Sequence, residues 1–398
     1  MLNKLKIKNL FGLYSYDFDF LFCKESPIRF ITGPNGYGKS TILGILSHLL
    51  QCDFMYFENL PFEEIQISFD EKLIVISRIP VEASDIREDL SKKSNTKQGK
   101  MRISLLNISN LVKESSFEII PGIESVKDNS GRLEIEMFLR GEPHYFIGDR
   151  RLLKTNSWMN GSEVIKSSDN VVNHNAEDLK KRLENCREQI NSILSIQNLA
   201  VDFSPVVEEV YENRKAVLTS GLKRMLDYGL AKGSFELPAY QPMADGLMGS
   251  FLNMAENAVG FATPLLEKVE LFKNIIERSD FVDKDIQISP DYGYRFVSRN
   301  QDRTLLDGSD LSSGEQHFLI QTYELIFNAQ KGSLALIDEP EMSFHIIWQM
   351  DFLRNIREIA KLKGLQCIVA THSPQIFDSM WELTSDLYEM SHPQKEDE

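Results

Sequence analysis

The chain has 398 residues, of which 42% are hydrophobic, and a formal net charge of −15. This length and composition allow one large or two ordinary globular domains, and the negative charge excludes a surface that attracts nucleic acid broadly, leaving room only for a local basic patch. Four cysteines without CxxC spacing indicate neither a zinc site nor a disulfide framework, and no apolar run is long enough for a membrane span, so we expect a cytoplasmic protein without a membrane partner.

The first 150 residues predict strands around a glycine-rich loop. Alternating polar and apolar side chains indicate the strands, and those within 62–80 are expected at the edge of a meander. A helix is expected over 41–50, and the polar segment 82–100 is interpreted as a loop or linker. The predicted strands are 3–8, 15–20, 26–32, two within 62–80, Leu133–Leu139 and His144–Ile147.

The middle of the chain predicts helices. Apolar residues recur at steps of four and three from Leu179 to Ile193, with Glu177 and Asp178 expected in the first turn of an amphipathic helix. Helix-compatible sequence continues to about Arg278. We therefore divide the chain into an N-terminal lobe, a helical insertion and a C-terminal lobe. Their ranges are 1–150, 151–280 and 281–398.

Strand patterns return in the C-terminal lobe at 286–289 and 292–297, followed by strand-helix-strand units around 333–339 and 365–371. Two basic clusters lie within the insertion or at its start, and each is interpreted first as a solvated surface and second as a nucleic-acid contact. These clusters are Arg150, Arg151 and Lys154, and Lys180, Lys181 and Arg182.

The glycine-rich loop fits the pattern G-x-x-x-x-G-K-[ST] between an apolar strand and a helix. Its backbone N–H groups can surround phosphates, Lys39 can reach the terminal phosphates of ATP, and the Ser40 hydroxyl can bind Mg²⁺. The predicted nucleotide-binding residues of this loop are Gly33, Pro34, Asn35, Gly36, Gly38, Lys39, Ser40 and Thr41.

A second motif is the apolar run 334–337, which ends in Asp338-Glu339-Pro340-Glu341. Carboxylates at the end of a buried strand are costly unless a cation or a polarised water lies there. Asp338 is therefore predicted to hold Mg²⁺ together with Ser40, and Glu339 to act as the general base toward water. Strands also commonly end in plain Asp-Glu turns, so this motif gains its meaning from the glycine loop.

Two further motifs accompany these. In Leu311-Ser312-Ser313-Gly314-Glu315-Gln316, Ser312 or Ser313 can cap a helix whose bare N–H groups form an anion site, although an ordinary helix start has the same pattern. His372 follows a buried strand at 366–371, at the carboxyl edge of a predicted parallel sheet, where ligands of open α/β folds bind.

In this order, the four motifs resemble the ABC-type ATPase heads of the SMC, RecF and OLD-like group, which are also described as AAA-family ATP-binding proteins. The resemblance implies an α/β P-loop NTPase head whose mixed sheet has an antiparallel N-terminal part and which carries a helical insertion. It also implies the cofactors ATP and Mg²⁺.

The resemblance further implies that heads pair as a homodimer or higher homo-oligomer. ATP on one loop would be closed over by another subunit's signature, for which Ser312, Ser313, Gly314 and Glu315 are the candidates. His372 would contact the γ-phosphate, and the loop Met342–His345 would lie across the interface. The family's Q-loop glutamine has no counterpart after His144–Ile147, where Gly148-Asp149-Arg150-Arg151 follows.

The helical insertion is short, and we expect no fused effector domain. In both respects the chain resembles stand-alone ATPase subunits of antiphage defence systems, such as Septu, PARIS and retron-linked operons. These subunits control a separately encoded effector, often a nuclease. Two alternatives stay open: a DNA-repair or chromosome-associated ATPase of the RecF and SMC kind, and a nucleotide-gated scaffold that sequesters a toxic partner with little turnover.

Overall fold

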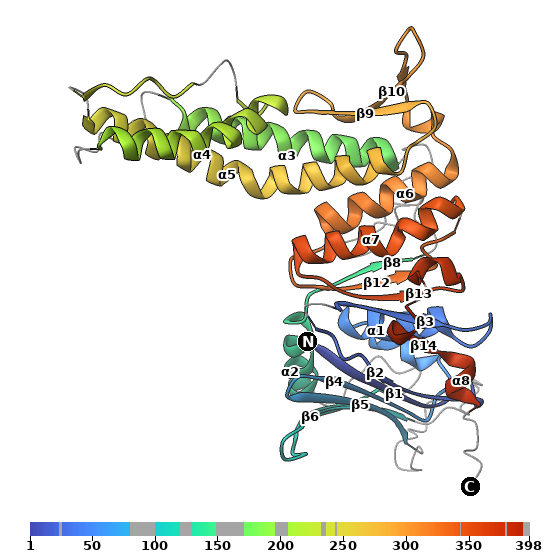
Figure 1. Cartoon of the computed structure of the whole chain (residues 1–398). Helices are drawn as coiled ribbons and strands as arrows, with labels where there is room; N and C mark the ends of the chain where they lie inside the picture. The colour runs from blue at the N-terminus through green and yellow to red at the C-terminus, as the bar shows by residue number, and fades with distance from the viewer. Residues whose placement is uncertain are drawn as a thin grey trace. The chain divides into compact units, whose positions relative to one another are not determined.

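A computed structural model shows two compact units, one formed by residues 1–149 with 329–398 and the other by residues 150–328 (Figure 1). The second unit contains the predicted insertion and continues through the predicted signature helix. The structure describes residues 1–23, 26–79, 100–119, 129–148, 171–195, 206–231, 236–242, 245–342, 344–378 and 380–392.

An antiparallel sheet of six strands forms one layer of the first unit, in the order β2-β1-β4-β5-β6-β7. Leu5 and Ile7 of β1 are buried, while Lys4 and Lys6 on the other face pair with Asp19 and Asp17 of β2 at 2.8 and 3.0 Å. The strands are β1 (Leu2–Leu10), β2 (Tyr14–Asp19), β4 (Glu64–Phe69), β5 (Lys72–Ile79), β6 (Lys100–Asn107) and β7 (Lys113–Ile119).

The prediction that the strands within 62–80 lie at an edge was wrong. β4 pairs with both β1 and β5, and β5 also pairs with β6, so both strands are interior. The sheet extends beyond them because the chain returns after the segment 82–100 to form β6 and β7. Both strands bury alternate apolar residues, such as Ile103 and Phe117, against the same core.

A parallel sheet of five strands forms the second layer of this unit, in the order β14-β3-β13-β12-β8. Figure 1 shows α1 (Lys39–Leu50) and α7 (Ile346–Lys363) on opposite faces of this sheet, which is why its central strands are continuous apolar runs. Its strands are β3 (Ile28–Thr32), β8 (His144–Ile147), β12 (Leu334–Asp338), β13 (Gln366–Ala370) and β14 (Thr384–Asp386).

The core of the first unit joins both sheets through α1. Ile42 and Leu46 of α1 are fully buried in one cluster with Ile7 of β1 and Leu336 of β12. Among its described residues, the unit also contains five further helical segments. They are η1 (Phe54–Glu58), α2 (Asn129–Arg140), η7 (Pro374–Phe377), η8 (Trp381–Leu383) and α8 (Leu387–Ser391).

The strand predicted at Leu133–Leu139 is wrong, because these residues belong to α2. Ile135 and Leu139, one helical turn apart, are fully buried, whereas Leu133 and Met137 are exposed. Arg132 and Glu136 also form an ion pair at 2.7 Å with helical spacing. The alternation of apolar and charged residues was therefore coincidental, and the pattern of burial has the period of a helix.

The second unit combines three long helices with a small antiparallel sheet. At Gly221 the helices α4 and α5 approach so closely that a Cβ atom would lie 2.5 Å from a Val259 methyl group. The elements are α3 (Val171–Ile193), α4 (Glu208–Asp227), α5 (Asp245–Arg278), β9 (Lys284–Ser289), β10 (Gly293–Ser298), β11 (Leu305–Leu306), η5 (Gly308–Asp310), α6 (Ser313–Tyr323) and η6 (Glu324–Asn328).

Helix α3 starts earlier than predicted. Glu177 and Asp178 are not in its first turn, because the buried Val171 and Val172 extend the helix toward the N-terminus. Asp178 instead accepts hydrogen bonds from Tyr323 at 2.6 Å and Arg182 at 2.8 Å. No helix in the described ranges combines the length and the apolar character needed to cross a membrane.

Three predicted features fall on residues outside the described ranges: the linker at 82–100 except for Lys100, which begins β6, the basic cluster at Arg150, and the segment after Gly148 where a Q-loop was sought.

Candidate functional site

The predicted phosphate loop connects β3 to α1, and its three glycines adopt backbone conformations that other residues rarely reach. Gly33, Gly36 and Gly38 have φ of 134°, 90° and 90°. In this region only glycine avoids a steric penalty. At Gly33, a Cβ atom would also lie 3.2 Å from Cβ of Leu387 in α8. The loop therefore requires glycine both for its curvature and for its packing.

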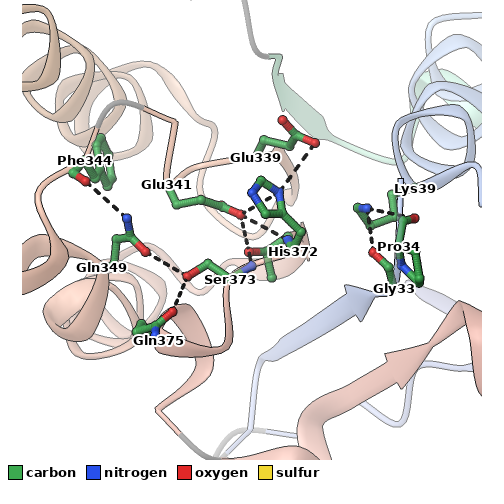
Figure 2. A network of polar contacts seen from close by, with 11 residues as sticks. Gly33, Pro34, Lys39, Glu339, Glu341, Phe344, Gln349, His372, Ser373 and Gln375 are labelled. Carbon is green, nitrogen blue, oxygen red and sulfur yellow. Dashed lines mark hydrogen bonds and ion pairs between the residues drawn. The ribbon is translucent and has the colours of Figure 1, made fainter. Parts of the chain in front are cut away.

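Lys39 is the first residue of α1 and is almost completely buried. Its Nζ donates hydrogen bonds to the carbonyl oxygens of Gly33 at 2.8 Å and Pro34 at 3.3 Å (Figure 2). The ammonium group thus spans the loop that would hold phosphates. Ser40 and Thr41 follow in the first turn of α1, where backbone N–H groups without helical partners can bind an anion.

The predicted acidic motif stands at the end of β12. Asp338 is the last residue of that strand and is 6% exposed, and Glu339 has a positive φ of 42°. The N–H of Glu339 donates to the carbonyl of Ala370 at 2.9 Å, so β12 stays attached to β13 at this point. The turn directs the Glu339 side chain away from the sheet core, and it is 27% exposed.

The switch histidine lies beside these acids. His372 Nδ1 is 3.8 Å from Glu339 Oε1 and 3.4 Å from Glu341 Oε1 (Figure 2). Because β3, β13 and β12 are adjacent parallel strands, their carboxyl ends lie along one edge of the sheet. The structure therefore brings the phosphate loop, Asp338, Glu339 and His372 to the same edge, which is where open parallel sheets bind ligands.

The residues predicted to hold Mg²⁺ have suitable chemistry. Ser40 supplies a hydroxyl oxygen and Asp338 a carboxylate oxygen, the donor type that Mg²⁺ prefers, and the ion commonly completes its shell with phosphate oxygens and water. Within the described ranges, no group of three or more His, Cys, Asp or Glu side chains could hold a metal ion. Ser40 and Asp338 would thus hold Mg²⁺ jointly with a nucleotide.

The predicted signature lies in the second unit, at the start of α6. Ser312 is the N-cap, and it forms a capping box with Glu315: Ser312 Oγ accepts from the Glu315 N–H at 3.3 Å, and the Glu315 carboxylate accepts from the Ser312 N–H at 2.7 Å. This arrangement leaves the N–H groups of Ser313 and Gly314 at the open end of the helix, where an anion can bind.

The Glu315 carboxylate has a second partner that the sequence did not indicate. Its Oε1 accepts from Lys284 Nζ at 2.9 Å, and both side chains are largely buried. Lys284 begins β9, so the ion pair ties the small sheet to the signature helix. Glu315 thus contributes to this region through the capping box and the ion pair.

A hydrogen-bond network around residues 371–373, which we call the switch loop, was also not predicted (Figure 2). Glu341 Oε1 accepts from Thr371 Oγ1 at 2.6 Å and from the His372 N–H at 3.0 Å. Farther along, Ser373 Oγ is 2.7 Å from Gln349 Oε1, and Gln349 Nε2 donates to the carbonyl of Phe344 at 3.1 Å. The only sequence signal for this network was the third acid of the Asp338 motif.

The loop predicted to lie across an interface leads into α7 with exposed apolar side chains. Met342 is 40% exposed, and Ile346, Ile347 and Met350 are 47%, 56% and 59% exposed.

The second predicted basic cluster includes Arg182, which contacts Asp178, the Phe327 carbonyl and Asn328 within its own unit. These bonds favour a structural role for Arg182 over a nucleic-acid contact.

Residues 143–378 match a family model described as "AAA domain, putative AbiEii toxin, Type IV TA system". No curated protein matches the chain. Two similar solved structures are an SMC head bound to the C-terminal winged-helix domain of ScpA, with 12% identity and a TM-score of 0.36, and an SMC head with an extended coiled coil bound to the C-terminal domain of ScpA from Pyrococcus furiosus, with 13% and 0.35. Each alignment covers 94% of this chain and 90% of the other.

Proposed function

We propose that this chain, which belongs to the AAA-domain family that residues 143–378 match, binds and hydrolyses ATP in paired heads and thereby regulates a separately encoded effector, a nuclease, in antiphage defence. The observation that carries the ATPase part is the meeting of Lys39, Glu339 and His372 at one edge of the parallel sheet. These residues come from three different motifs, and each supplies a group that ATP hydrolysis requires.

Each residue has a distinct chemical task in this proposal. The N–H groups of the phosphate loop bind the β- and γ-phosphates, and Lys39 exchanges its loop carbonyl partners for phosphate oxygens. Glu339 orients the attacking water and accepts its proton, and His372 contacts the γ-phosphate. When bound between Ser40, Asp338 and the nucleotide, Mg²⁺ neutralises the charge that develops on the phosphates.

Pairing of heads is supported by two features. The open N–H groups of Ser313 and Gly314 form an anion site of the kind that could close over a nucleotide held by another subunit. The exposed apolar residues from Met342 to Met350 directly follow the acidic motif. Exposed apolar side chains gathered in one short segment are typical of a contact surface, so ATP binding and assembly are expected to depend on each other.

The defence role rests on the family and on the resemblance of the sequence motifs. The family description names a toxin of a type IV toxin–antitoxin system, and such a system has two components by definition. This supports a chain that acts beside a separately encoded partner. The ATPase cycle would switch that partner between held and released states, because a ligand shifts an equilibrium when it binds one state more tightly.

The ATPase proposal is tested by steady-state phosphate release from the wild type and from Glu339→Gln. Loss of the general base is expected to lower kcat by about 100-fold or more, with ATP binding retained. Glu382→Gln, which changes an exposed glutamate of η8, is the matched control and should keep the wild-type rate. Equal rates for wild type and Glu339→Gln would exclude Glu339 as the base.

Assembly and biology require separate measurements. Light scattering of Glu339→Gln with ATP should show dimers or larger species that ADP does not support; a monomer under both conditions would exclude the paired head.

Coexpression with the neighbouring gene should lower phage plaque counts, and Lys39→Ala should remove this effect. Unchanged plaque counts across diverse phages would exclude the defence role, and turnover stimulated by DNA would favour a repair function instead.

A further inference from the structure

Glu341 is a buried carboxylate to which the motifs assign no task. It is 5% exposed, in the turn that follows β12 and the proposed base Glu339. A buried ionised carboxylate costs several kcal/mol unless hydrogen bonds or charges compensate it. Its position therefore requires partners that favour a carboxylate at this place.

Those partners all belong to the switch loop. Oε1 of Glu341 accepts hydrogen bonds from Thr371 Oγ1 at 2.6 Å and from the His372 N–H at 3.0 Å (Figure 2). Thr371 is fully buried, and its Oγ1 accepts in turn from the Ser373 N–H at 3.0 Å. Residues 371–373 follow β13, and the Thr371 N–H still donates to the carbonyl of Ile31 in β3 at 3.1 Å. Glu341 adds the contacts that hold the Thr371 side chain and the His372 N–H.

The same carboxylate also faces the imidazole. His372 Nδ1 lies 3.4 Å from Glu341 Oε1 and 3.8 Å from Glu339 Oε1. An ionised carboxylate only accepts hydrogen bonds, so a hydrogen bond between this oxygen and the ring requires a proton on Nδ1. The ring is 54% exposed and has room to turn if this contact is lost. Glu341 therefore sets both the backbone from which His372 projects and the direction of its ring.

We propose that Glu341 is a positioning residue for hydrolysis: it holds the switch loop so that the His372 imidazole faces the nucleotide. The proposal rests on the proposed ATPase function. Glu341 need not touch the nucleotide, and it acts only through His372. Its loss should lower kcat and leave the affinity for ATP nearly unchanged, because the phosphate loop does not depend on it.

The test is a double-mutant cycle of Glu341→Ala and His372→Ala, with kcat from phosphate release and Kd from fluorescent mant-ATP. Each single variant should lower kcat between about 10- and 100-fold, because displacement of a reacting group by about 1 Å has such an effect. The double variant should be no slower than His372→Ala alone. If the kcat loss of the double variant equals the product of the two single losses, the proposal is overturned. Such a result would mean that Glu341 acts independently of His372.

Conservative variants separate positioning from folding. Glu341→Gln keeps an acceptor oxygen toward Thr371 and the His372 N–H, so it should lose less activity than Glu341→Ala. Glu382→Ala is the exposed control and should keep the wild-type rate. Should Glu341→Ala fail to fold, Thr371→Val removes one donor at nearly equal volume and should give an intermediate kcat. The proposal would be contradicted if Thr371→Val and Glu341→Gln both keep the wild-type kcat and the losses of Glu341→Ala and His372→Ala are independent in the double variant.

A structural readout keeps this proposal distinct from the proposed function. In ¹⁵N-histidine spectra, the His372 signal, identified by its absence in His372→Ala, should show a proton on Nδ1 in the wild type and lose it in Glu341→Ala. A wild type without ATP turnover would overturn the proposed function, and the spectra would still decide whether Glu341 orients the ring. An unchanged His372 signal in Glu341→Ala would overturn the positioning role.

Discussion

Replacing Gly33 with alanine is expected to weaken ATP binding through backbone strain. At φ 134° a residue with a Cβ atom is disfavoured by about 1–3 kcal/mol. The added Cβ would also lie 3.2 Å from Leu387 Cβ and 3.4 Å from the Leu387 nitrogen, and the backbone atom has little room to move. The loop can relieve both penalties only by leaving the conformation that surrounds phosphates.

The expected magnitude follows from this competition. If ATP binding must restore the native loop, the dissociation constant for ATP rises with the strain energy. Each strain of about 1.4 kcal/mol raises this constant tenfold. Mant-ATP titration measures this change. Gly332→Ala is the matched control: Gly332 also has a positive φ, of 77°, but no atom lies within 4 Å of an added Cβ. It should lose about 1 kcal/mol of stability and keep its ATP affinity.

Urea unfolding of the two variants shows whether the strain is present. If Gly332→Ala is destabilised as expected but Gly33→Ala binds ATP as tightly as the wild type, the left-handed loop conformation is not what binding requires. A loss of affinity in both variants would instead indicate that general destabilisation, rather than the local conformation at Gly33, reduces binding.

Two further outcomes are expected elsewhere. Lys284→Met leaves the buried Glu315 carboxylate without its cation and should lower the free energy of unfolding in urea by about 2 kcal/mol, whereas Lys273→Met, on an exposed pair, should change it by less than about 0.5 kcal/mol. Burial raises the pKa of the Cys367 thiol to about 12, so brief iodoacetamide treatment at pH 8 should label the exposed Cys23 and spare Cys367; mass spectrometry showing equal labelling would contradict this.

Local sequence patterns were sufficient to predict most of the secondary structure and to propose the chemistry of the site. The strands β3, β12 and β13 were predicted because each is an apolar run that ends in polar residues. The phosphate loop was predicted because three glycines within six residues allow a curvature that other residues resist. Parallel strands then bring their carboxyl ends together, so these local predictions also placed the phosphate loop, Glu339 and His372 at one edge of the sheet.

The prediction from sequence failed where the period of a strand and the period of a helix fit the same residues. In 133–137 apolar and acidic residues alternate, yet Leu, Glu and Met favour helix, and only Ile135 is β-branched. The helix buries Ile135 and Leu139 and exposes Leu133. Helix propensity and i, i+4 charge pairing, as between Arg132 and Glu136, were the available signals.

Contacts between residues distant in sequence were beyond prediction. Glu341 meets Thr371 across 30 positions, and Lys284 meets Glu315 across 31. A buried acid is recognisable as costly, but the identity of the group that compensates it depends on which elements pack together. Sequence patterns therefore indicated the groups that would touch the nucleotide and missed those that hold them in place.

The order of strands in the parallel sheet has a consequence for synthesis of the protein. The phosphate loop leaves the ribosome early, after residue 41, but β3 lies between β13 and β14, and Thr32 donates a hydrogen bond to Asp386. Gly33 likewise packs on Leu387. The loop thus lacks its native neighbours until more than 340 further residues have been translated. Nascent chains are expected to wait with an unpaired apolar strand, in need of protection from aggregation, and to acquire nucleotide binding only near the end of translation.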